Sequence, residues 1–184
     1  VYTGFNISCV GDERTYSYLP SRDGEGPSDL VIQHVLKHTD PCYKTYSFLD
    51  RGSDERQYCA PGVDLKVASL MRSKYGEYPE YHTSKDDLNL VTPKGLGDSL
   101  LAYMRCVSII ENNNYYTANQ LCEPQMGKRG LYPTLGNNIL SQDTTRMMNI
   151  MAYCDGKKDI LDIANTIGAP AWELLPLVRI LQEH

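Results

Sequence analysis

The chain has 184 residues, enough for one hydrophobic core and a small appended unit, and it carries a formal net charge of -5 with a pI near 5.3. This acidic balance argues against a nucleic-acid-binding surface, because phosphate recognition needs a basic face. No run of about 18 apolar residues predicts a membrane span, and no charged-then-apolar N-terminal segment predicts a secretion signal.

The first half of the chain predicts alternating strands and helices. Strands are expected over residues 2–10, 15–19 and 44–49, and a helix from Pro27 to about residue 38 with Ser28 as its N-cap. Residues 67–71 are apolar without interruption, which indicates a buried strand and permits parallel pairing. The longest helix is expected over residues 92–111, with Pro93 in its first turn. This alternation favours an α/β layer.

The last third of the chain predicts a separate helical unit. Residues 114–140 are polar and contain several Asn, Pro and Gly residues, so they are expected to be a linker. Helices are expected over residues 142–153, 159–166 and 170–182, with Gly168 closing the second. Pro176 is expected to kink the third or to make its register uneven. Three short helices with a tight Gly-containing turn between the last two resemble a helix-turn-helix or winged-helix core. The predicted organisation is an α/β domain over 1–113, a linker over 114–140 and a small all-α, partial winged-helix-like domain over 141–184.

Six cysteines lie far apart and form no C-x-x-C pair, so they do not resemble a zinc ribbon or knuckle. Cys9 and Cys106 fall in apolar runs that suit buried free thiols. A reduced, cytoplasmic setting is therefore expected rather than a disulfide framework.

Two loops that flank the 67–71 strand carry the side chains best suited to chemistry. One ends with Ser53-Asp54, and the other contains Tyr81-His82-Thr83-Ser84. A carboxylate and an imidazole on loops at strand ends are a common way to build half of a metal site. The alternatives are a solvated surface histidine and an aspartate that caps its own turn.

Four phrases occur in order along the chain: CVGD at 9–12, GSDERQY at 52–58, YGEYPEYHTS at 75–84 and EPQMGKRGLYP at 123–133. Together they resemble bacterial aminopeptidase-like proteins of the dinuclear zinc aminopeptidase fold (zinc exopeptidase or glutaminyl-cyclase-like) that carry a C-terminal winged helix. The resemblance implies part of a mixed sheet flanked by helices. It also implies a zinc-dependent hydrolase that acts on a small peptide or an N-acyl amide.

The resemblance also implies roles for individual residues. His82 would be a zinc ligand, with a nearby acid as partner for its second nitrogen. Asp54 would lie in an acidic hydrogen-bond network beside the catalytic base. The family's strand-end zinc ligand is best matched by Cys9, with Asp12 three residues on, so a Cys9 ligand, an Asp12 ligand and an altered site all stay open.

Substrate-binding residues are expected close to these positions in sequence. Arginine holds a carboxylate through two parallel hydrogen bonds, so Arg56 or Arg72 is expected to recognise a carboxylate or an acidic sugar. Salt bridges to nearby acids are the alternative for both. The expected substrate-binding set is Arg56, Tyr58, Arg72 and Tyr81.

Several parts of the family pattern have no counterpart in this sequence. These are the upstream histidine, the bridging aspartate and the general-base glutamate. The chain also starts at Val1, inside an expected strand, without an initiator methionine. It is therefore expected to be the C-terminal portion of a longer enzyme and inactive alone, with a complementing N-terminal half or a homo-oligomer as partners.

Two functions of other classes remain open. The chain could be a non-catalytic module that binds a ligand or a partner, which an incomplete ligand set favours. A DNA-binding tail is the other, but residues 142–184 hold four basic against six acidic residues, which argues against it.

Overall fold

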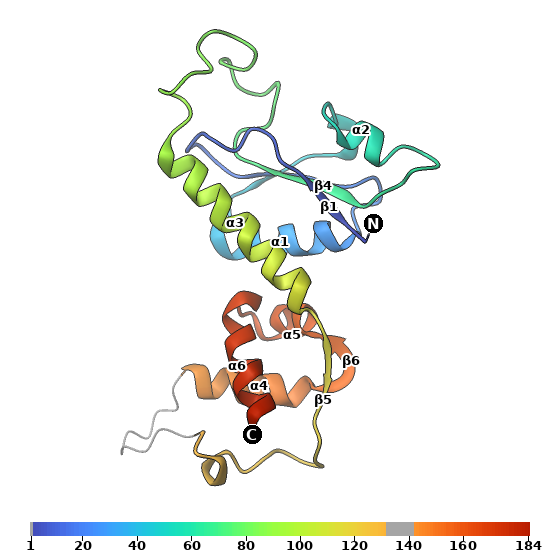
Figure 1. Cartoon of the computed structure of the whole chain (residues 1–184), viewed down its shortest axis with the longest axis vertical. Coiled ribbons are helices and arrows are strands. Elements are labelled where there is room, and N and C mark those ends of the chain that lie inside the picture. Colours follow the sequence, from blue (N-terminus) through green and yellow to red (C-terminus); the bar gives the residue numbers. More distant parts are fainter. Residues whose placement is uncertain (1, 132–141) are drawn as a thin grey trace. The chain divides into compact units, whose positions relative to one another are not determined.

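The computed structural model describes residues 2–131 and 142–184, and the chain divides into two compact units, Val1–Ile110 and Glu111–His184. Figure 1 shows both, coloured along the sequence. The end of the 123–133 phrase and most of the second half of the expected linker lie outside the described residues.

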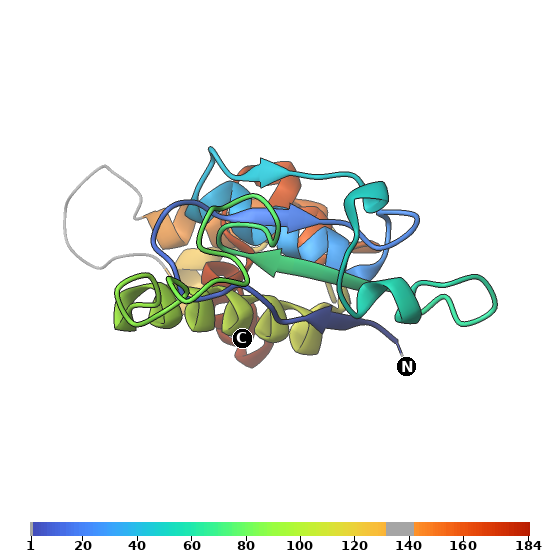
Figure 2. The same cartoon turned by 90° about the horizontal axis from the view of Figure 1, so that it is seen from above.

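A four-stranded mixed sheet forms the centre of the first unit. Its strands are β1 (Gly4–Asn6), β2 (Ser17–Leu19), β3 (Lys44–Thr45) and β4 (Val67–Met71). They lie side by side in the order β1-β4-β2-β3 (Figure 2). β4 pairs parallel with β1 and antiparallel with β2, and β3 pairs parallel with β2. Every residue of β4 is buried, so the buried strand predicted from the apolar run is confirmed.

Helices cover both faces of this sheet. α1 (Pro27–Thr39) and α3 (Pro93–Asn112) lie on one face, and the short α2 (Glu55–Tyr58) lies on the other (Figure 1). The core between sheet and helices is made of buried aliphatic and aromatic side chains, among them Leu19, Ile32, Leu36, Leu70, Met71 and Ile109. The mixed α/β architecture is as predicted.

The outer strands are shorter than their sequence patterns suggest. β1 covers three residues of the expected 2–10 strand. The expected 44–49 strand stops after two residues because a 3-10 helix, η1 (Phe48–Asp50), follows. Ser47 initiates that turn, since its hydroxyl accepts a hydrogen bond from the Leu49 N–H at 3.1 Å.

The prediction of Ser28 as the N-cap of α1 is wrong. Pro27 is the first helical residue, where its fixed φ and missing N–H are favourable, so Gly26 becomes the N-cap. The Asp29 carboxylate accepts a hydrogen bond from the Gly26 N–H at 2.9 Å. The Ser28 hydroxyl instead donates to the carbonyl oxygen of Lys66 at 2.8 Å.

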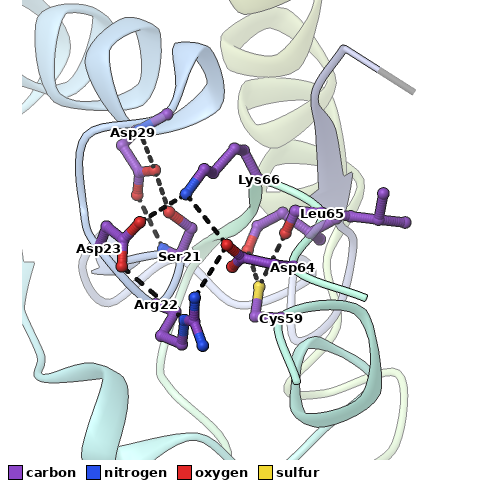
Figure 3. Close-up of polar contacts among 10 residues, drawn as sticks. Ser21, Arg22, Asp23, Asp29, Cys59, Asp64, Leu65 and Lys66 are labelled. Atoms are coloured by element: carbon purple, nitrogen blue, oxygen red, sulfur yellow. Dashed lines mark hydrogen bonds and ion pairs between the residues drawn. The ribbon is translucent and has the colours of Figure 1, made fainter. Parts of the chain in front are cut away.

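A polar cluster holds the entry to β4 (Figure 3). Lys66 forms ion pairs with Asp23 and Asp64, and Arg22 reaches Asp64 at 2.9 Å. The thiol of Cys59 donates to the carbonyl oxygen of Leu65 at 3.2 Å. Exposed ion pairs are individually worth well under about 1 kcal/mol, so their main effect is to fix the loop geometry where β4 begins.

The second unit is a winged helix. It contains α4 (Gln142–Tyr153), α5 (Ile160–Ile167) and α6 (Ala171–Glu183). β5 (Tyr115–Thr117) pairs antiparallel with β6 (Asp155–Asp159), and a 3-10 helix, η2, spans Met126–Arg129. β5 belongs to the segment that the sequence pattern suggested as linker, and neither strand was expected. The expected end of α5 at Gly168 is confirmed by its left-handed φ of 68°, while α6 continues as one helix through Pro176.

Across the described residues, none of the helices combines the length and the apolar character that a membrane crossing requires.

Candidate functional site

The candidate site lies at one edge of the first unit's sheet. Because β1 and β4 run parallel, their carboxyl ends meet at the same edge, which is where ligands bind in many α/β sheets. The loop after β1 and the loop after β4 are joined there by a hydrogen bond from the Arg72 N–H to the Cys9 carbonyl oxygen at 2.8 Å. A cavity of about 400 Å³ opens between these loops. Its lining includes Cys9, Asp12, Tyr78, Tyr81, His82 and Asp86.

Asp12 ties the two loops together. It is buried, and its carboxylate accepts hydrogen bonds from the Ser73 N–H at 2.9 Å and the Ser73 hydroxyl at 3.0 Å. It also accepts one from the Arg14 N–H at 2.9 Å. Both carboxylate oxygens are therefore used within the protein, so Asp12 stabilises the shape of the cavity.

Cys9 places a thiol at the cavity in a constrained backbone conformation. Its φ is 51°, in the left-handed region that is uncommon for residues other than glycine. The Tyr78 hydroxyl donates to the Cys9 sulfur at 3.6 Å. Burial and this hydrogen bond raise the pKa of Tyr78 well above its ordinary value, so the phenol stays protonated as the donor.

His82 is presented to solvent on an aromatic stack. Its φ is 57°, and its ring stacks on Tyr81 with the ring centres 3.9 Å apart and the planes 18° from parallel. Tyr81 in turn packs edge-on against Tyr78, with ring centres 5.6 Å apart. Within the described residues no hydrogen bond to either His82 ring nitrogen is formed, so both nitrogens face the cavity or water. The stack fixes the plane of an imidazole that stays available to a ligand.

The acidic residues near His82 in sequence differ in their hydrogen-bond and ion-pair partners. Glu80 forms a two-pronged ion pair with Arg14, at 2.8 and 3.0 Å. Asp87 accepts hydrogen bonds from Asn89. Asp86 lines the same cavity as His82 and is the nearby acid best placed to share a ligand with it.

A buried carboxylate, Glu55, organises the loop beside this site. It is fully buried and accepts hydrogen bonds from the Tyr75 hydroxyl at 2.6 Å and the Asn6 amide at 2.7 Å. The N–H groups of Gly52 and Ser53 donate to it at 2.8 and 2.9 Å. Burial opposes its ionisation, but these hydrogen bonds outweigh that cost and hold the pKa of Glu55 below its ordinary value.

Two family models match the sequence, one for each part of the chain. Residues 1–113 match a family described as a domain of unknown function (DUF4910), and residues 114–184 match a winged helix-turn-helix family. The chain belongs to the DUF4910 family.

The relatives of this DUF4910 chain are longer proteins. One is named "Putative polysaccharide biosynthesis protein with aminopeptidase-like domain", from Clostridium acetobutylicum, and is 40% identical over 167 residues. That match covers 90% of this chain and 38% of the relative. A crystal structure described as a "putative peptidase" from the same organism aligns over the whole chain with a TM-score of 0.85 and 36% identity. The chain covers 40% of that structure.

The DUF4910 fold brings some of the predicted site residues together and separates others. His82, Asp12, Tyr81 and Cys9 line the same cavity. Asp54 is exposed at the start of α2, without a side-chain hydrogen bond in the part of the chain that the structure describes. A hydrogen-bond network was expected around Asp54, whereas in the described residues a buried network forms around its neighbour Glu55.

The other expected substrate-binding residues lie away from the cavity. Arg56 and Tyr58 are exposed on α2. Arg72 is buried, with its guanidinium 4.0 Å from the centre of the Tyr16 ring, and does not line this cavity. Sequence reasoning missed Glu55 and Tyr78. A usable signal for Glu55 was its place at the first turn of a helix, directly after two backbone N–H groups that need acceptors.

The donor types at the cavity suit zinc, but the arrangement does not complete a zinc centre. Thiolate, imidazole and carboxylate are all zinc ligands. However, both Asp12 oxygens are engaged, and the described residues contain no group of three or more His, Cys, Asp or Glu side chains that would hold a metal. A zinc ion at this edge would need ligands from elsewhere.

Proposed function

We propose that this chain forms one wall of the active site of a peptidase-like hydrolase, with the cavity between the β1 and β4 loops as the substrate site. The observation that carries the proposal is the His82 ring, which the Tyr81 stack holds at that cavity with both nitrogens free of bonds to described residues. The peptidase-like names of the longer relatives support the same reaction class.

Each wall residue has a distinct part in this proposal. His82 supplies an imidazole in a fixed plane. The hydroxyl of Tyr78 and the thiol of Cys9 line the same cavity and orient the amide to be cleaved. Asp12 and Glu55 touch no substrate; they position the loops through the hydrogen bonds described above.

A zinc ion enters only as part of this proposal. In the longer protein, His82 would supply one ligand, and residues outside this chain would complete the ligand set and supply the general base. Substrates would be small peptides or N-acyl amides. The winged-helix unit would serve as a protein-contact module, because residues 142–184 hold four basic against six acidic residues, a balance that disfavours contact with a nucleic acid.

The first test follows the histidine ring signals by NMR while zinc is added to the chain. We expect the His82 ring signals to move first. His184 is the matched control, because it is also exposed but lies in the other unit. Equal responses of His82 and His184 would contradict a ligand role for His82.

The second test concerns the reaction itself. The full-length Clostridium acetobutylicum relative would be assayed for hydrolysis of aminoacyl p-nitroanilides and N-acyl amides, before and after treatment with a chelator. We expect hydrolysis that the chelator abolishes and added zinc restores. Absence of hydrolysis on every amide would favour the non-catalytic binding module instead.

A further inference from the structure

A second, smaller cavity adjoins the candidate site. It measures about 150 Å³ and shares Tyr78 with the cavity that holds His82. We call it the Lys74 pocket; its charged and hydroxyl-bearing lining includes Arg14, Ser17, Lys44, Tyr46, Lys74 and Glu77. A space of this size fits one functional group of a ligand, since sites for whole small molecules usually exceed about 300 Å³.

Lys74 is a buried ammonium group without an anionic partner. Only 6% of the residue is exposed. Its Nζ donates to the Tyr75 carbonyl oxygen at 3.2 Å and lies 4.3 and 5.3 Å from the ring centres of Tyr75 and Tyr46. Among residues 2–131 and 142–184, no carboxylate comes within ion-pair distance of it. A buried charge is costly unless it is paired, so Lys74 retains donors that a bound anion would satisfy.

Ser17 adds an unused hydroxyl to the same pocket. This first residue of β2 is fully buried, and its Oγ has no hydrogen-bond partner in the described structure. It lies close enough to the Tyr46 phenol to affect the pKa of that group, but the two hydroxyls do not meet the geometry of a hydrogen bond. Buried hydroxyls are normally paired, so this one also points to a missing acceptor.

The charge around the pocket favours an anion. Lys44 lines the pocket, is exposed, and forms no ion pair with a described residue. Arg14 is already engaged by Glu80. Glu77 is the one acidic residue in the lining, and it is exposed to solvent rather than bonded to Lys74. Lys74 and Ser17 offer two donors in a narrow aromatic-walled space, which suits the two oxygens of a planar carboxylate better than a tetrahedral phosphate.

We propose that the Lys74 pocket binds the carboxylate of a substrate whose amide lies in the neighbouring cavity, on the other side of Tyr78. This inference rests on the proposed hydrolase function and narrows its substrates to N-acyl amino acids and short peptides with a free carboxylate. The pocket sets which end of the substrate is held, while His82 and Cys9 face the bond to be cleaved.

The test measures binding rather than turnover. The chain would be titrated with N-acetylglycine, with its neutral analogue N-acetylglycinamide and with inorganic phosphate, following the backbone amide signals of Ser17, Tyr46 and Lys74 by NMR. We expect N-acetylglycine to bind and to shift these three signals, with much weaker responses to the amide and to phosphate. Lys74→Met should weaken N-acetylglycine binding by about tenfold or more, because a hydrogen bond to a charged group is lost.

Two further variants sharpen the result. Ser17→Ala removes a neutral hydrogen bond and should weaken binding by about two- to tenfold. Lys85→Met is the matched control, because Lys85 is exposed on the same loop and lines neither cavity, so its affinity should equal that of the wild type. If Lys74→Met does not fold, as judged by circular dichroism, Ser17→Ala and the amide analogue decide the question.

Three outcomes would overturn the proposal: equal binding of acid and amide, tighter binding of phosphate, or unchanged affinity in both pocket variants. These results are separable from the fate of the proposed function. Carboxylate binding without amide hydrolysis by the longer relative would keep the subsite and reject the hydrolase. Amide hydrolysis by the longer relative, together with unchanged N-acetylglycine affinity in both pocket variants, would keep the hydrolase and reject the subsite.

Discussion

Replacing Glu55 with glutamine should destabilise the first unit more than its conservative size suggests. One carboxylate oxygen accepts three hydrogen bonds, from Tyr75 and from the N–H groups of Gly52 and Ser53, and the other accepts one from Asn6. A glutamine keeps one acceptor oxygen without its charge and turns an NH2 group toward the NH2 group of Asn6. We expect the free energy of unfolding to fall by about 2–4 kcal/mol, from weaker charge-assisted bonds and one buried donor left unpaired.

The assay is native-state hydrogen exchange in urea, read at the amides of β4. This strand is fully buried and pairs on both sides, so its amides report unfolding of the first unit. Asp54→Asn is the matched control, since its exposed side chain makes no hydrogen bond to a described residue, and we expect a change within about 0.5 kcal/mol. Equal effects of the two substitutions would refute the assignment of the buried carboxylate to Glu55.

The stability difference between the wild type and Glu55→Gln should depend on pH, with a definite sign. The folded protein holds the pKa of Glu55 below its ordinary value of 4.5, because hydrogen bonds from Tyr75 and the backbone outweigh the burial penalty. A depressed carboxyl pKa adds stability above the unfolded pKa, and that stability is lost as the pH falls through the folded pKa. The difference in stability between wild type and Glu55→Gln should therefore be constant near neutral pH and shrink below about pH 4.5. A gap that widens on acidification would contradict this sign.

Three further perturbations test the packing around the site. At Gly95 an added Cβ would lie 2.1 Å from a backbone carbonyl oxygen of the loop after β1, so Gly95→Ala should lower the free energy of unfolding by about 3 kcal/mol or more. Gly97 has open space around it, so Gly97→Ala should raise the free energy of unfolding by about 0.5–1 kcal/mol. Urea melts would measure both. Asp12→Asn should lower the free energy of unfolding by about 1–3 kcal/mol, because one of two engaged oxygens is lost. Burial raises the pKa of Cys106 to about 12, so iodoacetamide at pH 8 should label the exposed Cys42 in the native protein and Cys106 only in urea, as mass spectrometry would show.

Regular hydrophobic patterns carried most of the fold prediction. The apolar run of β4 indicates both the strand and its burial, and both are observed. The helical spacing of apolar residues indicates α3, but not its buried face, because Leu100, Met104 and Val107 of that apolar series are exposed. The pair β5 and β6 has no such pattern. β6 reads Asp-Gly-Lys-Lys-Asp and is largely exposed, so its pairing with β5 depends on contacts between segments about 40 residues apart. Local propensity does not contain that information.

For the site residues, the alternation of side chains along a strand predicts the direction of some side chains, whereas long-range contacts determine the others. Met71 ends β4 and packs with Leu19 on the face that bears α2, so period-two alternation sends Arg72 to the opposite face, under Tyr16 and near Asp98 of α3. The strand pattern therefore predicts the face of the sheet to which Arg72 points.

The choice between Asp54 and Glu55 did not follow from any local pattern. Neighbouring residues at a helix start point about 100° apart, so only one of two adjacent carboxylates can turn inward. Glu55 is selected because Asn6 and Tyr75, distant in sequence by 49 and 20 residues, present their donors on that side. A motif match thus locates the loop, while long-range hydrogen bonds determine which carboxylate points inward. For this reason the comparison of Glu55→Gln with Asp54→Asn tests the buried position that the structure assigns to Glu55, which the motif alone does not predict.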